Sequence, residues 1–227
     1  MQDLYPMSNS SEKTSSLGII SKNAAFFFPY AITLIIALGI ILLFNKDAIH
    51  LYINQLHSPF QDMFFTYFTW LGDGIFAVMV ALIFFVFRFR YGIMLFLGFT
   101  LSGIVVQIMK KWIFVNHIRP YRYFSDEVSL HLIEGARLYK NNSFPSGHTT
   151  TAFALFLGIA LLSNNKWIKI LCLITAWLVG YSRVYLSQHF LVDITAGSLL
   201  GIFFSMMVYF FMMRSNKQWL DKSIIKL

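Results

Sequence analysis

Six long apolar segments constrain this chain more than any other feature of its sequence. A segment that crosses a bilayer needs about 20 apolar residues and must satisfy its own backbone hydrogen bonds, so it is usually a helix. No alternation of polar and apolar residues indicates a membrane β-barrel. We therefore expect an all-α membrane protein, a six-transmembrane-helix bundle. The segments cover residues of about 25–44, 74–88, 92–110, 149–163, 167–182 and 190–213.

The composition excludes a soluble globule. Hydrophobic residues make up 57% of the 227 residues and charged residues 12%, about half the charged fraction of an ordinary soluble domain. The mean hydropathy of +0.64 also excludes a disordered chain. Cys172 has no cysteine partner for a disulfide within the chain. We assign the net charge of +8 to membrane orientation and expect no nucleic-acid partner.

The distribution of cations predicts which way the bundle faces. With the N-terminus in the cytoplasm, that side carries ten Lys and Arg against three acidic residues, and the other side carries eight against seven. The positive-inside rule then places both termini in the cytoplasm of a multi-pass protein of the cell (inner) membrane. We expect a polar tail at 1–23, a membrane domain at 24–214 and a cytoplasmic C-terminal tail at 215–227. Ser58-Pro59-Phe60-Gln61 predicts the start of an interfacial helix between the first two spans.

Polar residues collect at the ends of the apolar segments that share the opposite, non-cytoplasmic face. Because successive spans alternate in direction, the end of the third, the start of the fourth, the end of the fifth and the start of the sixth meet at one membrane surface. Charges near lipid are costly unless they have a function. The set consists of Lys111, Arg119, Ser146, Gly147, His148, Arg183, His189 and Asp193.

This set suits a phosphoryl group. The two Arg side chains and Lys111 carry positive charge, and the N-terminus of the fourth helix offers the N–H groups of residues 146–148 to an anion. His189 and Asp193 are four residues apart on one helical face, so the carboxylate can orient the ring as a nucleophile. His148 is then the general acid that protonates the leaving oxygen.

The same residues resemble the type 2 phosphatidic acid phosphatase (PAP2) superfamily, which is related to the vanadium haloperoxidases. Ser182-Arg183, five residues, His189, three residues and Asp193 resemble its third motif, and residues 145–148 (Pro-Ser-Gly-His) its second. The first motif is normally Lys, six residues and Arg-Pro. Here seven residues separate Lys111 from Arg119-Pro120, and Trp112 takes the usual lysine position.

The first motif leaves three alternatives open: a helix bulge presents Lys111, Lys110 replaces it, or Arg119 acts without a lysine. The resemblance covers motifs within 111–193. It implies metal-independent hydrolysis of a lipid phosphate through a phosphohistidine, without a cofactor, at a site facing away from the cytoplasm. The implied substrates are phosphatidic acid, phosphatidylglycerol phosphate, isoprenyl (di)phosphate or a lipid A phosphate, with the phosphorylated lipid and membrane lipids as the partners.

Other interpretations compete with this one. His148, His189 and Asp193 also match a two-His, one-carboxylate metal site, but three converging cations favour an anion. A lipid phosphotransferase uses the same site, and a six-span transporter or structural membrane protein is the alternative from another class. Arg122 either contacts a substrate headgroup or extends to the membrane surface. The loop from 121 to 142 is expected to be a lid, with charged residues Asp126, Glu127, Glu134, Arg137 and Lys140.

Overall fold

The computed structural model describes residues 16–124, 129–134 and 138–225. Its α-helices are α1 (Ser16–Lys22), α2 (Ala24–Leu43), α3 (Lys46–Gln55), α4 (Pro59–Phe68), α5 (Gly74–Phe87), α6 (Phe89–Ile108), α7 (Pro120–Tyr123), α8 (Gly147–Leu162), α9 (Lys166–Tyr185) and α10 (Leu191–Arg214). Three short turns complete the order: η2 (Thr69–Gly72) and η4 (Gln218–Asp221) are 3₁₀-helical, and η3 (Met109–Ile113) is π-helical. The described residues include no β-strand, as the sequence predicts.

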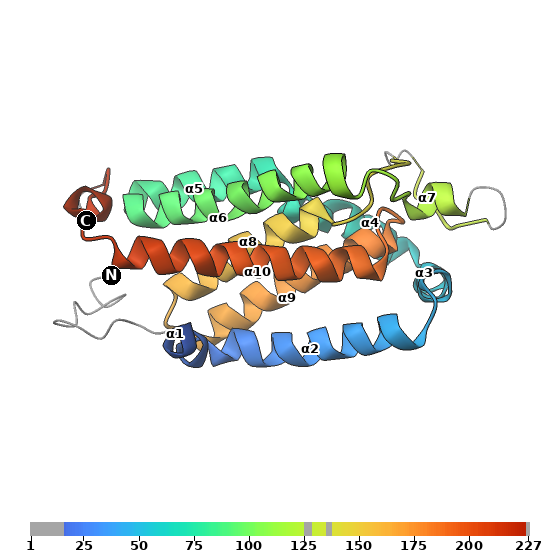
Figure 1. Cartoon of the computed structure of the whole chain (residues 1–227), viewed down its shortest axis with the longest axis horizontal. Helices are drawn as coiled ribbons and strands as arrows, with labels where there is room; N and C mark the ends of the chain where they lie inside the picture. The colour runs from blue at the N-terminus through green and yellow to red at the C-terminus, as the bar shows by residue number, and fades with distance from the viewer. Residues whose placement is uncertain (1–15, 125–128, 135–137, 226–227) are drawn as a thin grey trace.

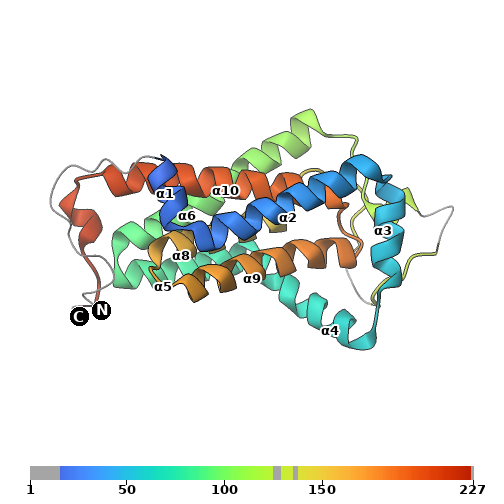
Figure 2. The same cartoon turned by 90° about the horizontal axis from the view of Figure 1, so that it is seen from below.

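Each of the six apolar segments forms a helix, and these helices lie side by side along the long axis of the molecule (Figures 1 and 2). In the described residues, four stretches are long and apolar enough to cross a membrane: α2, α6 with η3, α9 and α10. The pair α4–η2 and α5 adds a fifth span only if its 55° bend lies within one crossing. The chain is therefore an all-helical membrane protein with four or five candidate spans, and a count of six is not confirmed.

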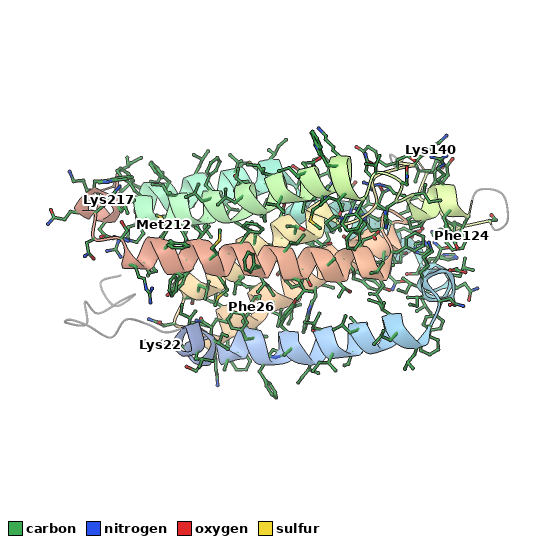
Figure 3. All side chains as sticks on the ribbon, viewed as in Figure 1. Lys22, Phe26, Phe124, Lys140, Met212 and Lys217 are labelled. Carbon is green, nitrogen blue, oxygen red and sulfur yellow. The ribbon has the colours of Figure 1, made fainter. Side chains whose placement is uncertain are left out.

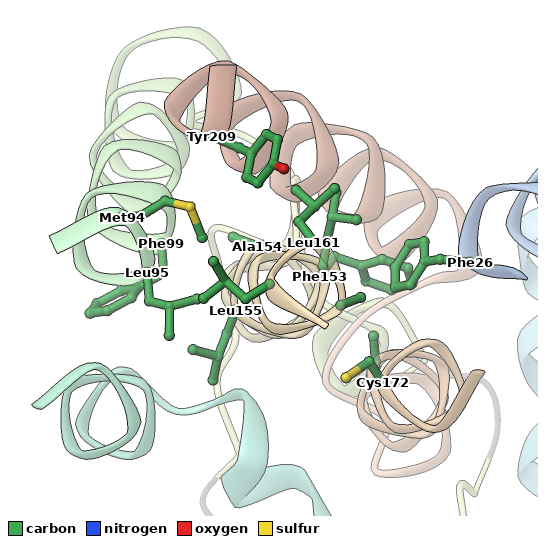
Figure 4. Close-up of a cluster of buried hydrophobic side chains, with 14 of the residues drawn as sticks. Phe26, Met94, Leu95, Phe99, Phe153, Ala154, Leu155, Leu161, Cys172 and Tyr209 are labelled. Atoms are coloured by element: carbon green, nitrogen blue, oxygen red, sulfur yellow. The ribbon is translucent and has the colours of Figure 1, made fainter. Parts of the chain in front are cut away.

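Helix α8 lies in the centre of the bundle. Its 16 residues pack against α6, α9 and α10, and Leu155 and Leu157 are fully buried. Figure 4 shows side chains of α8 between Met94 of α6, Cys172 of α9 and Tyr209 of α10. In helix α2, by contrast, only 11% of the most apolar 18-residue stretch is buried. The bundle is thus built around α8, and α2 runs along its outside (Figure 2).

The two ends of the bundle are different. Lys22 and Lys217 lie at one end and Lys140 at the other (Figure 3). At the first end, Arg90 binds both carboxylate oxygens of Asp221 through Nε and an NH2 group, at 2.8 and 2.7 Å. The N–H of Ile224 donates to the carbonyl of Val86 at 3.0 Å. The segment after α10 therefore docks on the junction between α5 and α6.

A pair of glycines brings α10 against α8. Gly197 and Gly201 are one turn apart, and a Cβ atom added at Gly201 would lie 2.5 Å from the carbonyl oxygen of Thr150 and 2.9 Å from the amide nitrogen of Ala154. Helices in a membrane gain little from burying apolar surface, since lipid is equally apolar, so close backbone packing at small residues holds them together. The position of α8 relative to α10 depends on this contact.

We expect Gly201→Ala to destabilise the protein. The added methyl group meets backbone atoms that cannot move aside, and such overpacking costs about 1–3 kcal/mol. Gly39→Ala on α2 is the matched control, because its Cβ meets nothing within 4 Å and alanine favours a helix by up to about 1 kcal/mol. Thermal unfolding in detergent measures both variants. Equal midpoints for the two would contradict the close packing of α8 and α10.

Candidate active site

The end of the bundle opposite η4 gathers the predicted site residues. His148 lies in the first turn of α8, Arg183 in the last turn of α9 and Asp193 in the first turn of α10. His189 lies in the loop between α9 and α10, and Arg119 immediately precedes α7. Each histidine is close enough to the other cationic groups to be affected by their charge. The structure thus brings the two imidazoles into one positively charged cluster.

Asp193 holds His189 in a fixed orientation. Its Oδ2 lies 3.3 Å from Nδ1 of His189, and it also accepts hydrogen bonds from the hydroxyl of Ser143 at 2.5 Å and the N–H of Phe190 at 2.9 Å. Both His189 and Asp193 are 2% exposed. With Nδ1 engaged, Nε2 is the ring nitrogen left to react. Ser143, three residues before Ser146, was not a sequence candidate, and no spacing pattern singles it out.

The protonation state of His189 follows from its surroundings. Burial lowers the pKa of His189 well below its usual 6.5, and the positive charges of Arg119, Lys110 and Arg183 lower it further. A lowered pKa keeps the ring neutral as pH falls toward 6.5. The neutral ring is the form that can act as a nucleophile.

The two arginines are held by opposite sides of the site. Arg119 donates from Nε to the carbonyl of Asn141 at 2.9 Å and from an NH1 group to the carbonyl of Gln188 at 3.2 Å. Arg183 donates from an NH1 group to the hydroxyl of Thr69 at 2.8 Å. Its Nε is buried and has no hydrogen-bond partner among the described residues. A buried, unpaired donor of this kind favours a bound oxyanion.

Lys110, and not Lys111, faces this cluster. It is 8% exposed and close enough to Arg119 and Arg183 for their charges to act on it. Lys111 is exposed and lines a cavity of about 570 Å³ between α5, α6 and α8. The helix is π-helical here, and the extra residue of a π turn changes which side chains face inward. Of the two lysines, the structure places Lys110 and not Lys111 near Arg119 and Arg183, so Lys110 replaces Lys111 as the proposed lysine of the first motif.

Ser146 is also used differently from the prediction. Its backbone N–H donates to the carbonyl of Asp193 at 3.0 Å, and its hydroxyl accepts from the backbone N–H of Thr149 at 3.4 Å. Because these groups join α8 to α10 and cap α8, the Ser146 amide is not available to a phosphate. Gly147 and His148 follow it in the first turn of α8, where the amides of a helix that lack an intrahelical partner can bind an anion.

The junction between α4 and α5 contributes residues that none of the sequence motifs includes. Thr69 of η2 accepts the hydrogen bond from Arg183. Gly72 leaves no room for a Cβ, which would lie 2.8 Å from the carbonyl oxygen of His148. The carboxylate of Asp73 is 4.0 Å from Nε2 of His148. Gly72-Asp73-Gly74 is a turn signature between two apolar segments, so a signal for this junction was present.

Three of the remaining histidines pack against other rings. His50 is buried against Phe124 and Phe190, and burial lowers its pKa to about 4. The rings of His57 and His131 are stacked 3.7 Å apart. In the described residues, no group of three or more His, Cys, Asp or Glu side chains is arranged to hold a metal ion.

The predicted lid is described only in part. Glu134 and Lys140 are exposed, whereas Asp126, Glu127 and Arg137 lie outside the described residues. Arg122 is exposed, and its guanidinium donates to the side-chain oxygen of Asn141 at 2.5 Å. Since Arg119 binds the carbonyl of Asn141, Arg122 lies at the rim of the site.

Comparison with known proteins identifies the family. The chain belongs to the PAP2 superfamily, whose family model matches residues 91–217. The crystal structure of LpxE from Aquifex aeolicus is similar, with a TM-score of 0.65 and 29% identity, over 74% of this chain and 98% of that one. The structure of a transmembrane PAP2-type phosphatidylglycerolphosphate phosphatase from Bacillus subtilis gives a TM-score of 0.61 and 26% identity, over 86% of this chain and 98% of that one.

A curated relative points to the same activity. The lipid A 4'-phosphatase of Bacteroides thetaiotaomicron is 28% identical over 167 residues, which cover 70% of this chain and 73% of the relative. The chain is therefore a membrane protein of a family whose curated relatives include lipid phosphatases.

We expect Lys110→Ala to lower kcat/KM for a lipid phosphate by about 10²-fold or more, because a buried charge-assisted contact to phosphate is worth roughly 3 kcal/mol. Lys111→Ala removes an identical side chain one residue away, at the cavity and not at the cation cluster, and should lower kcat/KM far less. Phosphate release in detergent measures both. The reverse order of the two variants would return the first motif to Lys111.

The acid limb of kcat/KM should report the charge around His189. Removing one positive charge raises the pKa of this ring, so Arg119→Gln should move the acid limb to higher pH. The exposed Arg122→Gln is the control and should leave the limb in place. Both are measured on one substrate, so its own ionisation cancels from the comparison. An unshifted limb in Arg119→Gln would argue against coupling of the two groups.

Proposed function

We propose that this chain is an integral-membrane lipid phosphatase that hydrolyses a lipid phosphate through a phosphohistidine and without a metal. The observation that carries the proposal is the oriented pair of His189 and Asp193, set beside His148 among three buried cations. A neutral imidazole in a positively charged pocket suits attack on phosphorus, whereas the same pocket repels a divalent cation.

The first step transfers the phosphoryl group to the protein. Arg119, Arg183 and Lys110 bind the phosphate oxygens, and Nε2 of His189 attacks phosphorus in line with the lipid oxygen. The P–O bond to the lipid breaks, its electron pair stays on the lipid oxygen, and His148 supplies the proton. Asp193 stabilises the positive charge that develops on His189.

The second step releases phosphate. His148, now neutral, takes a proton from water as the water oxygen attacks phosphorus. The P–N bond breaks and His189 returns to its neutral form. Both steps depend on charges already in place before the substrate binds, so little reorganisation is needed.

The relatives define the candidate substrates. They are named for lipid A, for phosphatidylglycerophosphate and, at 35% identity in Sulfolobus acidocaldarius, for undecaprenyl diphosphate. All three place a phosphate on an apolar anchor. The cavity of about 570 Å³ is lined by Gly103, Ile104 and Ile108 of α6 and by Gly74, the residue after Asp73. We assign an apolar chain of the substrate to this cavity.

The proposed topology has both termini in the cytoplasm of the inner membrane and the site on the opposite face. Support comes from the cation count and from the position of α1 and η4 at the end of the bundle away from α3 and α7 (Figure 1). The transporter alternative loses support, because the buried cations gather at helix ends rather than midway along the helices.

His189→Ala should abolish phosphate release, and His148→Ala should slow it by about 10²- to 10⁴-fold, the usual contribution of a general acid. His117→Ala is the control, since that ring lies against Phe114 and Phe144 outside the cluster. The purified variants are assayed on phosphatidic acid, phosphatidylglycerol phosphate, undecaprenyl diphosphate and lipid A.

Brief incubation with ³²P-labelled substrate tests the intermediate. An acid-labile, base-stable label on the unchanged protein, absent from His189→Ala, is the expected result. Near-normal turnover by His189→Ala would refute the assigned nucleophile.

A further inference from the structure

The junction between α4 and α5 is fixed against the first turn of α8. The turn η2 packs on both α8 and α9. A Cβ added at Gly72 would lie 2.5 Å from Cγ1 of Val179 and 2.8 Å from the carbonyl oxygen of His148. Only a residue without a side chain allows this approach. The position of the next residue, Asp73, relative to His148 is therefore set by backbone packing.

One oxygen of Asp73 has a structural role and the other faces His148. Oδ1 accepts a hydrogen bond from the N–H of Ile75 at 2.8 Å and caps α5. Oδ2 lies 4.0 Å from Nε2 of His148, and the two side chains are 34% and 35% exposed. At this distance the two groups form an ion pair only when His148 is protonated, and they are too far apart for a hydrogen bond. Nε2 makes no hydrogen bond to Asp73, so a proton carried on it can be directed at a substrate oxygen.

The other groups that act on His148 carry positive charge or can acquire it. They are Lys110 of η3, Arg183 of α9, and Arg119 and His189 from loops. All of them oppose a positive charge on His148. A general acid, however, must hold its proton when the substrate arrives. Asp193 is bound to His189 and its neighbours, whereas Asp73 faces His148 directly.

We propose that Asp73 is a positioning residue that keeps His148 protonated and aimed at the leaving oxygen. The inference rests on the proposed function. In the first step the P–O bond to the lipid breaks, its electron pair goes to the lipid oxygen, and that oxygen takes the proton from His148. In the second step the ring removes a proton from the attacking water, and the ion pair with Asp73 forms again.

Asp73→Asn tests the inference, because asparagine keeps the cap on α5 and removes the charge. On phosphatidic acid, whose alkoxide must be protonated, kcat should fall about 10- to 100-fold, part of the 10²–10⁴ that a general acid contributes. On p-nitrophenyl phosphate, whose leaving group departs without a proton, kcat should change little. The alkaline limb of kcat on phosphatidic acid should move to lower pH.

Three further variants complete the experiment. Asp73→Glu restores the charge and should recover part of the rate on phosphatidic acid. Asp73→Ser also caps the helix, and should reproduce the selective loss if Asp73→Asn does not fold. Asp47→Asn removes the same charge from the first turn of α3 and should leave both substrates and the pH profile unchanged.

Loss of activity on both substrates alike, loss on neither, or an unmoved alkaline limb would overturn the role of Asp73. His148→Ala separates this result from failure of the proposed function. If His148→Ala also fails to slow hydrolysis of phosphatidic acid more than that of p-nitrophenyl phosphate, the general-acid assignment itself is wrong. If His148→Ala is selective and Asp73→Asn is not, only the inference about Asp73 fails.

Discussion

The carboxylate of Asp193 is the interaction on which the rest of the site depends. Its side chain accepts hydrogen bonds from Ser143 and Phe190 and orients His189, and its backbone carbonyl accepts from Ser146. One residue thus joins the start of α10, the loop before it and the start of α8. An ionised carboxylate is costly to bury unless its oxygens are fully paired. The hydrogen bonds from Ser143 and Phe190 offset this cost and fix the carboxylate that aligns the ring of His189.

The cations around this carboxylate are held in place at a further cost. Lys110, Arg119 and Arg183 are all buried and repel one another. Carbonyl groups from the loops and the hydroxyl of Thr69 take up some of their donors. In the proposed function, a bound phosphate offsets this repulsion. An anion site of this kind is preorganised, and the central position of α8 gives it a rigid base.

The parts of this structure that follow local patterns could be predicted from sequence. The six apolar segments became the six long helices because each satisfies its own backbone, and Ser58 caps α4 as its spacing indicates. The spacing of His189 and Asp193 needs only one helical turn.

Lys110 was left as one alternative, since a π turn alters the register by one residue and leaves no mark in composition. The contact of Gly72 with His148 joins residues far apart in the chain, and no periodicity reports such a contact. The span count also depends on the 55° bend, which apolar length alone does not encode.

The docking of Asp221 on Arg90 has a consequence for biogenesis. Arg90 is 6% exposed and lies at the start of α6, yet its carboxylate partner follows α10 in the chain. During synthesis the guanidinium of Arg90 has no carboxylate partner until Asp221, 131 residues later, has been translated. The ion pair can therefore form only after α10 has been made, and it joins the end of the chain to the start of α6.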